Sequence, residues 1–340
     1  MKEIYKKYIR NISWFIPDDR IYTDDLRCLA WGTDAGFYRH IPQVVVRSKT
    51  EEEVSRLLAE ASKLGLPVTF RAAGTSLSGQ TTTDSIMIVA GKNWEKYEVN
   101  DDASVITMQP GIVGHKVDEI LRPYGKTFTP DPASKNSAMV GGIVMNNASG
   151  MSCGTHANSD KVMKSMRIVF ADGTVLDTGD ADSRNAFKQS HPEIIKGIED
   201  IRDRVLADDE LVKRIKHKYA IKNVTGLNIY PFVEHTDPFD IITHLMVGSE
   251  GTLGFASEFT MYPYSSSAML YFKDMREACE CVVALKNSPV ECAELLDKKS
   301  LASVNDTTGE NLTAILVRTS ADTKEQLAAN VAAMEKGLEG

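Results

Sequence analysis

The sequence has no apolar run near the roughly 20 residues that a membrane-spanning helix needs. Its basic start, MKEIYKKYIR, is not followed by the apolar stretch of a secretory signal. Cysteine is scarce: there are 5 in 340 residues, an odd number without framework spacing. This predicts a reducing, cytoplasmic location rather than a disulfide scaffold. The net charge is −8, so no overall positive field favours nucleic acid.

Common catalytic signatures are also missing. No Gly-Lys-Ser/Thr follows a glycine-rich loop, and the chain has no G-x-G-x-x-G motif. A hydrolase or transferase acting on a nucleotide is therefore the least favoured of the functions we weigh. The 7 histidines show no His-x-His spacing and no Cys-x-x-Cys accompanies them, so we predict no metal site.

The composition is that of an ordinary globular protein, with 42% hydrophobic and 25% charged residues. A length of 340 residues suggests about two domains. The pattern along the chain predicts an N-terminal lead-in at 1–36, whose second half is too polar for a core element. A domain follows at 37–265, with subdomains at 37–100 and 101–265 and a charged helical insertion at 184–225. The last unit, at 266–340, alternates between β-type and helical patterns.

A βαβ unit is the clearest local pattern. Short β-type runs at 43–48 and 66–71 flank a helix with an apolar face. Thr50 is its predicted N-cap, with Glu53 completing a capping box, and Gly65 is its predicted C-terminal residue. The two strands are expected to run parallel. Further on, the pattern predicts two strands within 86–109, a helix over 111–125 and a β-hairpin over 164–179 that turns at Asp172-Gly173.

Three tracts are rich in small residues: RAAGTSLSGQ after the second strand of the βαβ unit, a polar tract over 129–163, and VGSEGTLG at 247–254. Small side chains let an anion approach the backbone N–H groups, and Ser and Thr add hydroxyl donors. Arg71 is placed to offset negative charge nearby. Three such tracts, far apart in the sequence, suggest a long polar ligand. The alternative that remains open is three unrelated surface turns.

At these tracts the sequence resembles the flavoprotein superfamily of p-cresol methylhydroxylase and vanillyl-alcohol oxidase. It is most similar to the D-lactate dehydrogenase/glycolate oxidase D-subunit branch, in the form fused to an iron–sulfur domain. The motifs that carry the resemblance are YTDDLRCLAWGTDAGFYRHIPQVVV, RAAGTSLSGQ, DPASKNSAMVGGIVMNNASGMSCGT and MVGSEGTLGF. It implies an α+β fold: a two-subdomain FAD-binding domain, of a βαβ and a mixed-sheet subdomain, followed by the start of an α+β cap.

The resemblance also assigns FAD-binding residues by motif. The diphosphate cradle would comprise Arg71, Ala73, Gly74, Thr75, Ser76, Leu77, Ser78 and Gln80. The flavin ring would lie along Pro130, Asp131 and Ser134, and the adenosine–diphosphate tract along Gly141, Gly142, Asn146, Ser149, Gly150 and Gly154. The site would be closed by Glu250, Gly251 and Thr252. Covalent members often carry a His just after the turn glycine; Thr75 stands there, so non-covalent FAD is expected.

The resemblance implies an FAD-dependent dehydrogenase of small D-2-hydroxy acids, of the D-lactate or D-2-hydroxyglutarate class. Electrons would pass to an iron–sulfur, quinone or cytochrome acceptor, which leaves open peripheral membrane association through that acceptor and a homo-oligomer. An iron–sulfur cluster is expected only with a further C-terminal domain, because Cys279 and Cys281 point to different sides of a predicted helix. Lys218 and Lys222 either help to hold a carboxylate or form a solvated basic helix end.

No catalytic residue is assigned, because the family's catalytic His lies in a later part of the cap. The cap strands at 268–272 and 313–318 have few return strands to cover them. We therefore expect a truncated flavin half, or a subunit completed by another chain. The competing hypothesis is a flavin-binding fragment or subunit without turnover of its own.

Overall fold

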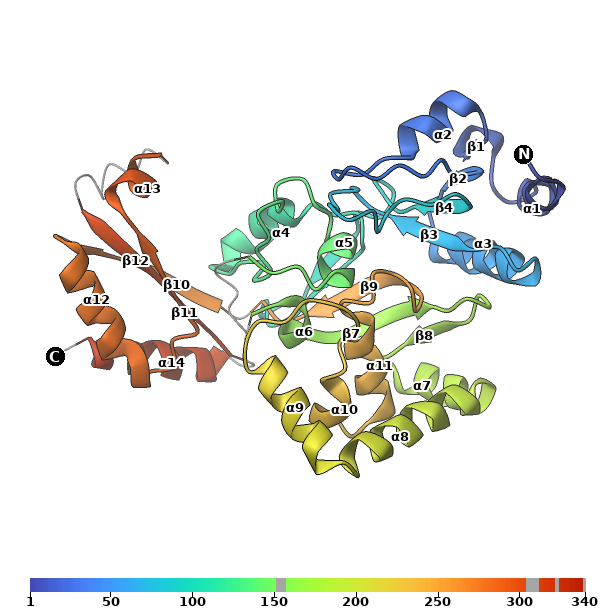
Figure 1. Cartoon of the computed structure of the whole chain (residues 1–340). Helices are drawn as coiled ribbons and strands as arrows, with labels where there is room; N and C mark the ends of the chain where they lie inside the picture. The colour runs from blue at the N-terminus through green and yellow to red at the C-terminus, as the bar shows by residue number, and fades with distance from the viewer. Residues whose placement is uncertain (151–156, 264, 304–311, 322–323, 339–340) are drawn as a thin grey trace.

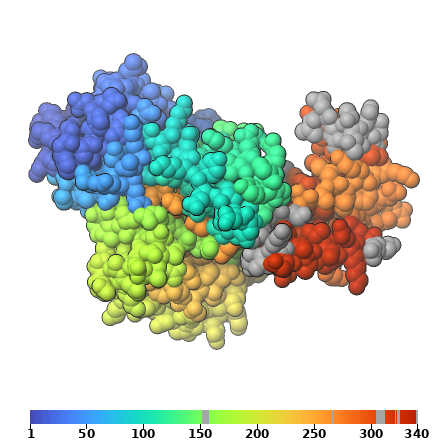
Figure 2. Space-filling model, turned by 180° about the vertical axis from the view of Figure 1, so that it is seen from behind, coloured from blue at the N-terminus to red at the C-terminus, as the bar shows by residue number. Residues whose placement is uncertain are grey.

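The computed structural model describes residues 1–150, 157–263, 265–303, 312–321 and 324–338. They form three sheets with helices packed on them (Figure 1). Two sheets build the bulk of the molecule, and the third stands with its helices to one side (Figure 2). The expected α+β class, with two subdomains and a following α+β unit, is confirmed.

The first sheet holds the predicted βαβ unit. Its strands lie in the order β1 (Ile21–Tyr22), β2 (Val44–Arg47), β4 (Ile86–Val89) and β3 (Val68–Arg71). Its helices are α1 (Glu3–Ile12), α2 (Asp25–Trp31) and α3 (Glu51–Lys63), with a 3-10 turn at Asp18–Arg20. β2 and β3 are parallel, as predicted, but β4 lies between them and pairs with both. The carboxyl ends of β2 and β3 therefore flank that of β4.

The α3 helix forms for the reasons read from its sequence. The Thr50 hydroxyl accepts a hydrogen bond from the Glu53 backbone N–H at 3.2 Å, and the Glu53 carboxylate accepts one from the Lys49 N–H at 2.7 Å. Its buried face, which includes Leu57, packs on the sheet. Gly65 ends it with φ of +63°, a conformation that glycine adopts without strain.

The N-terminal lead-in is not too polar for the core, which corrects the expectation for residues 16–34. Ile16 and Ile21 are buried in the same cluster as Leu57, and Cys28 lies under the other face of the sheet. The charged side chains between them are satisfied locally: Arg20 donates to both carboxylate oxygens of Glu53, at 2.7 and 2.8 Å. A low average hydropathy concealed single apolar residues that point inward.

The second sheet is antiparallel throughout, in the order β5 (Tyr97–Val99), β6 (Ile106–Met108), β9 (Phe255–Met261), β7 (Met163–Val169) and β8 (Val175–Asp177). The predicted hairpin at 164–179 is confirmed as β7 and β8. The predicted helix over 111–125 is α4 (Gly114–Leu121) with a 3-10 turn at Arg122–Tyr124. The small-residue tract over 129–163 contains two short helices, α5 (Val140–Met145) and α6 (Ser159–Val162), and is not all loop.

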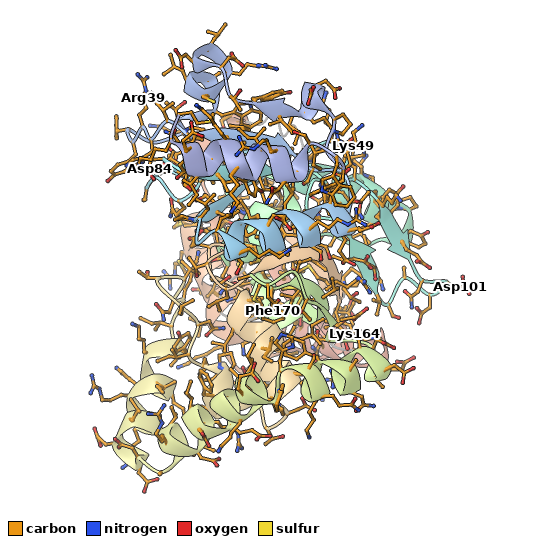
Figure 3. The ribbon with its side chains drawn as sticks, turned by 90° about the vertical axis from the view of Figure 1, so that its right-hand side faces the viewer. Arg39, Lys49, Asp84, Asp101, Lys164 and Phe170 are labelled. Atoms are coloured by element: carbon orange, nitrogen blue, oxygen red, sulfur yellow. The ribbon has the colours of Figure 1, made fainter. Side chains whose placement is uncertain are left out.

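The predicted helical insertion at 184–225 is helical but belongs to a core layer. It comprises α7 (Ala181–Ser190), α8 (Pro192–Leu206) and α9 (Asp209–Tyr219), and is followed by α10 (Pro231–Glu234) and α11 (Pro238–Met246). Phe187 and Ile195 are buried in the main cluster of the second sheet. Phe170, at the end of β7, stacks on Phe187 at 5.0 Å and lies between α3 and these helices (Figure 3).

The third sheet has the order β10 (Ser265–Phe272), β12 (Thr313–Ser320) and β11 (Cys292–Leu296). Its helices are α12 (Met275–Ala284), α13 (Lys298–Ser303) and α14 (Lys324–Gly337), with a 3-10 turn at Leu285–Asn287. β10 and β12 pair with each other, and α12 and α14 cover Ile315 and Val317. The two strands expected to lack return partners are thus partners of one another.

An ion-pair cluster joins the first two sheets. Arg167 of β7 donates to Glu51 of α3 through Nη2 at 2.7 Å and Nε at 3.0 Å, and to Asp177 of β8 at 3.1 Å. The Ser257 hydroxyl of β9 also donates to Glu51. Burial acts to raise the pKa of Glu51, but the hydrogen bonds from Arg167 and Ser257 outweigh it, and the pKa is lowered overall. The cluster holds α3 against the second sheet.

Replacing Arg167 by methionine is expected to lower the free energy of unfolding by about 2 kcal/mol at pH 7. This is less than a fully buried pair would lose, because the Arg167 side chain is 36% exposed. A carboxyl with a lowered pKa stabilises the fold above its unfolded pKa, and this contribution fades as the pH falls through the folded value. The variant should therefore lose less stability than the wild type on acidification below about pH 4.5. Urea unfolding at pH 7 and at a pH below about 4.5 measures this difference. A variant that loses the exposed ion pair of Arg276 serves as the control.

Candidate functional site

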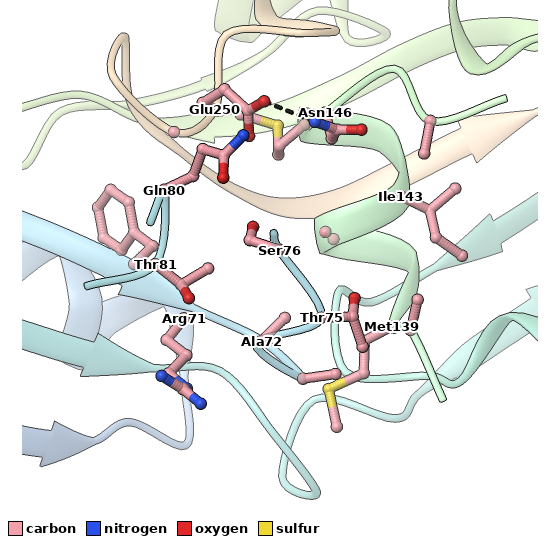
Figure 4. A pocket seen from close by; sticks show the side chains of 18 of the residues that line it. Arg71, Ala72, Thr75, Ser76, Gln80, Thr81, Met139, Ile143, Asn146 and Glu250 are labelled. Atoms are coloured by element: carbon pink, nitrogen blue, oxygen red, sulfur yellow. Dashed lines mark hydrogen bonds between the residues drawn. The ribbon is translucent and has the colours of Figure 1, made fainter. Parts of the chain in front are cut away.

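A pocket of about 390 Å³ opens between the first two sheets. Three polar tracts contribute to its lining: the loop after β3, the tract around α5, and the turn before β9 (Figure 4). The sequence-predicted residues that the structure brings together there are Arg71, Ala73, Gly74, Thr75, Ser76, Leu77, Ser78, Gln80, Ser134, Gly141, Gly142, Asn146, Ser149, Glu250 and Gly251. The three tracts therefore converge on one cavity and are not unrelated turns.

The loop after β3 takes its shape from two glycines. Gly74 and Gly79 have φ of +75° and +82°, in the left-handed region that disfavours other residues. The Gly79 backbone N–H donates to the Asp34 carboxylate at 3.0 Å, and the Tyr38 ring lies against Gly79. The segment between α2 and β2 thus helps to hold this loop in place.

Arg71 lines the pocket, but its guanidinium also has a structural task that the sequence did not reveal. Nη1 donates to the backbone carbonyl oxygens of Thr33 at 2.5 Å and Trp31 at 3.3 Å, and the group lies 5.3 Å from the centre of the Trp31 ring. Burial lowers the pKa of Arg71. A Cβ on Gly74 would meet Nη2 at 2.3 Å, so a side chain at this position would have to displace the guanidinium.

The α5 wall consists largely of backbone. A Cβ on Gly141 would meet the Pro110 side chain at 2.6 Å, so this glycine permits close packing. A Cβ on Gly142 would meet no described atom within 4 Å, because this position faces the open pocket. Gly142 therefore keeps the cavity clear, whereas Gly141 fixes the helix in place.

Three polar side chains meet at one end of the pocket. The Asn146 amide donates to Glu250 at 2.6 Å, and Gln80 lies beside them (Figure 4). Burial raises the pKa of Glu250, against the opposing hydrogen bonds from Asn146 and Gln80. Glu250 has φ of +56°, which costs of order 1 kcal/mol for a residue other than glycine. Its N–H donates to the Met145 carbonyl oxygen at 2.8 Å, which ties the turn before β9 to α5.

Four predicted residues lie outside the pocket lining: Pro130, Asp131, Gly150 and Thr252. Asp131 is 3.7 Å from the Lys135 ammonium, and the Thr252 hydroxyl donates to the Ser249 carbonyl oxygen at 2.6 Å. A Cβ on Gly150 would overlap the Asp131 carbonyl oxygen, at 1.6 Å, so Gly150 serves close packing. Gly154, the remaining predicted residue, lies outside the described residues.

Sequence reasoning missed the apolar half of the lining. Phe70, Pro110, Met139, Ile143, Val224 and Phe255 contribute to it. Apolar side chains carry no chemical signature, and only their position next to the polar tracts would have pointed to them. Val224 comes from the segment between α9 and α10, which the sequence connected to the site only through Lys218 and Lys222.

The donor set fits FAD. Arg71 Nε, Thr81 Oγ1 and Ser149 Oγ line the pocket and are buried without a hydrogen-bond partner among the described residues. Buried donors of this kind are costly unless a ligand satisfies them. Small residues also leave backbone N–H groups accessible to a diphosphate. The apolar lining suits a planar ring system, and the volume is within the usual range of cofactor pockets.

No described histidine lines the pocket. Among the described residues, no group of three or more His, Cys, Asp or Glu side chains is placed to hold a metal ion. On α12, Cys279 is exposed and Cys281 is buried, which agrees with the predicted opposite sides. Within the described part of the chain, no helix combines the length and apolarity needed to cross a bilayer.

Comparisons with known proteins give the family. Residues 42–179 match the FAD binding domain, and residues 262–340 match the C-terminal domain of FAD linked oxidases. D-2-hydroxyglutarate dehydrogenase of Haemophilus influenzae is 25% identical over 70% of this chain and 25% of its own length. D-lactate dehydrogenase of Archaeoglobus fulgidus is 24% identical over 78% of this chain and 50% of its own length. The chain thus spans between about a quarter and about a half of the length of these curated relatives.

The fold comparison agrees. A solved structure of alkyldihydroxyacetonephosphate synthase has a TM-score of 0.60 at 15% identity, over 98% of this chain and 60% of that one, which shows a shared fold. The two family matches follow one another along the chain, and together they cover well over half of its residues. The resemblance expected from the sequence is confirmed at this level: the chain carries the FAD binding domain and, after it, the C-terminal domain of FAD linked oxidases.

Proposed function

We propose that this chain is an FAD-dependent dehydrogenase of D-2-hydroxy acids, of the D-lactate or D-2-hydroxyglutarate class. The observation that carries the proposal is the convergence of three small-residue tracts on a pocket with unpartnered buried donors. The names of the relatives support the substrate class. Electrons would leave to an iron–sulfur, quinone or cytochrome acceptor.

FAD, when bound, supplies the hydride acceptor for oxidation of the hydroxy acid. The chain's own residues bind and orient it. The backbone N–H groups of the loop after β3, with Ser76 and Ser78, would hold the diphosphate. Met139 and Ile143 would exclude water from the ring system. The hydroxyl groups of Ser149 and Thr81 would donate hydrogen bonds to oxygen atoms of the cofactor.

Anaerobic titration tests the reaction. The purified chain should show flavin absorption near one FAD per chain, and D-lactate or D-2-hydroxyglutarate should bleach it while the L-enantiomers do not. A preparation that stays colourless after incubation with FAD would refute the flavin site itself. Bound flavin that no D-2-hydroxy acid bleaches would support the second candidate, a flavin-binding part without turnover of its own. That candidate is favoured by the absence of a described histidine from the pocket lining.

We also propose that FAD is held without a covalent bond, because Thr75 occupies the position after Gly74 where covalent members often carry a His. Acid precipitation should release all of the yellow colour into the supernatant, where its spectrum is that of free FAD. Colour that stays in the washed pellet would contradict this. A protein with a known covalent flavin serves as the control.

A further inference from the structure

One side of the pocket is formed by residues 128–134, which we call the wall segment. Pro132 and Ser134 of this segment line the cavity. The segment belongs to no helix or strand and runs between the 3-10 turn at Arg122–Tyr124 and α5. The regular hydrogen bonds of a helix or a sheet therefore do not fix it, and other contacts have to hold it beside the cofactor.

A largely buried salt bridge provides the main contacts. Lys135 directly follows the wall segment, and its side chain is 12% exposed. Its ammonium donates to the Phe128 carbonyl oxygen at 2.7 Å and lies 2.7 Å from the Asp118 carboxylate of α4. Asp118 also accepts a hydrogen bond from the Phe128 backbone N–H at 2.8 Å. Lys135 and Asp118 thus bring the two ends of the wall segment together at one point on α4.

The backbone and the stem of Lys135 are also attached. Its N–H donates to the Pro132 carbonyl oxygen at 2.8 Å, and its carbonyl oxygen accepts from the His115 N–H of α4 at 3.1 Å. A Cβ on Gly114 would meet Lys135 Cγ at 3.0 Å, so the stem of the lysine packs closely on the start of α4. The ammonium is therefore carried by a side chain whose base is held against α4.

The middle of the wall segment faces the same ammonium. The Asp131 carboxylate lies 3.7 Å from Lys135 Nζ. A neutral side chain at position 135 would therefore remove the cation that Asp118 and Asp131 share and the donor that the Phe128 carbonyl oxygen uses. Losing a charged hydrogen-bond donor in a largely buried place is costly, and the structure can lower this cost by moving the segment toward water.

We propose that Lys135 is a positioning residue for the flavin: its ammonium holds the wall segment against α4 and so sets the width of the pocket beside the cofactor. The inference rests on the proposed flavin site. Pro130 and Pro132 stiffen the segment, because each proline fixes its own φ. Releasing the ends of so stiff a segment moves the lining residues Pro132 and Ser134 with them.

The main experiment compares the FAD dissociation constants of the wild type, Lys135→Met and Arg20→Met. Lys135→Met keeps most of the side chain and removes the ammonium, so the dissociation constant should rise about tenfold. Arg20→Met breaks a similarly buried salt bridge, that with Glu53, outside the pocket lining. It should unfold at a lower urea concentration than the wild type and bind FAD equally well. Wild-type affinity in Lys135→Met would overturn the proposal.

Spectra at saturating FAD separate positioning from stability. The visible band of a tightly enclosed flavin shows resolved shoulders; these should weaken in Lys135→Met and persist in Arg20→Met. Shoulders that persist in Lys135→Met would contradict the proposal.

A double-mutant cycle tests whether Lys135 acts through α4. Asp118→Asn removes the negative charge of the salt bridge and keeps an acceptor for the Phe128 N–H. If the proposal holds, Asp118→Asn combined with Lys135→Met should bind FAD no more weakly than Lys135→Met alone. Losses of affinity that add up in the double variant would show that the two residues act independently and would overturn the proposed attachment.

Deuterium exchange in the flavin-free chain keeps this inference separate from the flavin site. Peptides from residues 126–139 should exchange several-fold faster in Lys135→Met than in the wild type, and Arg20→Met should match the wild type. Equal exchange in all three proteins would overturn the proposal even if FAD binds well. If the wild type binds no FAD, the proposed function fails, and the exchange result still decides whether Lys135 holds the wall segment.

Discussion

Replacing Gly142 by leucine is expected to abolish flavin binding and leave the fold intact. The added side chain points into the open pocket, since no described atom lies within 4 Å of its first carbon. It therefore occupies space that the cofactor needs, and we expect affinity to fall by about 100-fold or more. Gly142 lies within α5, where leucine is a better helix former than glycine by up to about 1 kcal/mol. The melting temperature of the flavin-free chain should not decrease.

The chain provides a matched control. Gly197 lies in α8, also faces open space, and does not line the flavin pocket. Gly197→Leu should gain the same helix propensity and keep the wild-type affinity for FAD. Flavin titration and thermal unfolding of both variants give the comparison. Undiminished FAD binding by Gly142→Leu would show that the cofactor lies elsewhere, and the assignment of this pocket would be wrong.

Much of the site was predictable because its signals are local. Thr50 and Glu53 form the N-cap of α3 as their spacing suggests, and the strand before Arg71 ends where the small residues begin. The small residues after it are needed for backbone geometry, as the positive φ of Gly74 shows. Such requirements act within a few residues, so the sequence displays them.

The remaining features depend on contacts between distant segments. β4 pairs between β2 and β3 because of the sheet as a whole, and no local pattern specifies that order. Phe187 reads as part of a charged helix, yet it is buried against the second sheet. Val224 lines the pocket from the segment between α9 and α10, where Lys222 donates to Gly150 and Asn228 donates to Asp160. These relations bring residues together across dozens of positions, which periodicity and motifs do not encode.

The role of Arg71 also depends on contacts with a distant segment. Its replacement has the second large effect that we expect. The sequence suggested a charge for the cofactor, but the structure directs Nη1 to the carbonyl oxygens of Trp31 and Thr33. Arg71→Met keeps most of the volume and leaves both acceptors unpaired. Hydrogen bonds from a charged donor contribute about 1.5–3 kcal/mol each, so we expect unfolding to become easier by about 4 kcal/mol. FAD affinity should fall together with stability, because the Thr33–Asp34 segment also holds Gly79 in the cradle loop.

Arg47 is the control, because it ends β2 as Arg71 ends β3, and both lie opposite Val89 of β4. Its Nη1 donates to the Tyr22 hydroxyl at 3.2 Å, and it does not line the pocket. Arg47→Met should cost about 1 kcal/mol and leave FAD affinity unchanged. Urea unfolding and flavin titration of both variants decide the matter. Equal losses of affinity would mean that the sheet edge in general supports the cradle, whereas a loss confined to Arg71→Met assigns that role to its two carbonyl contacts.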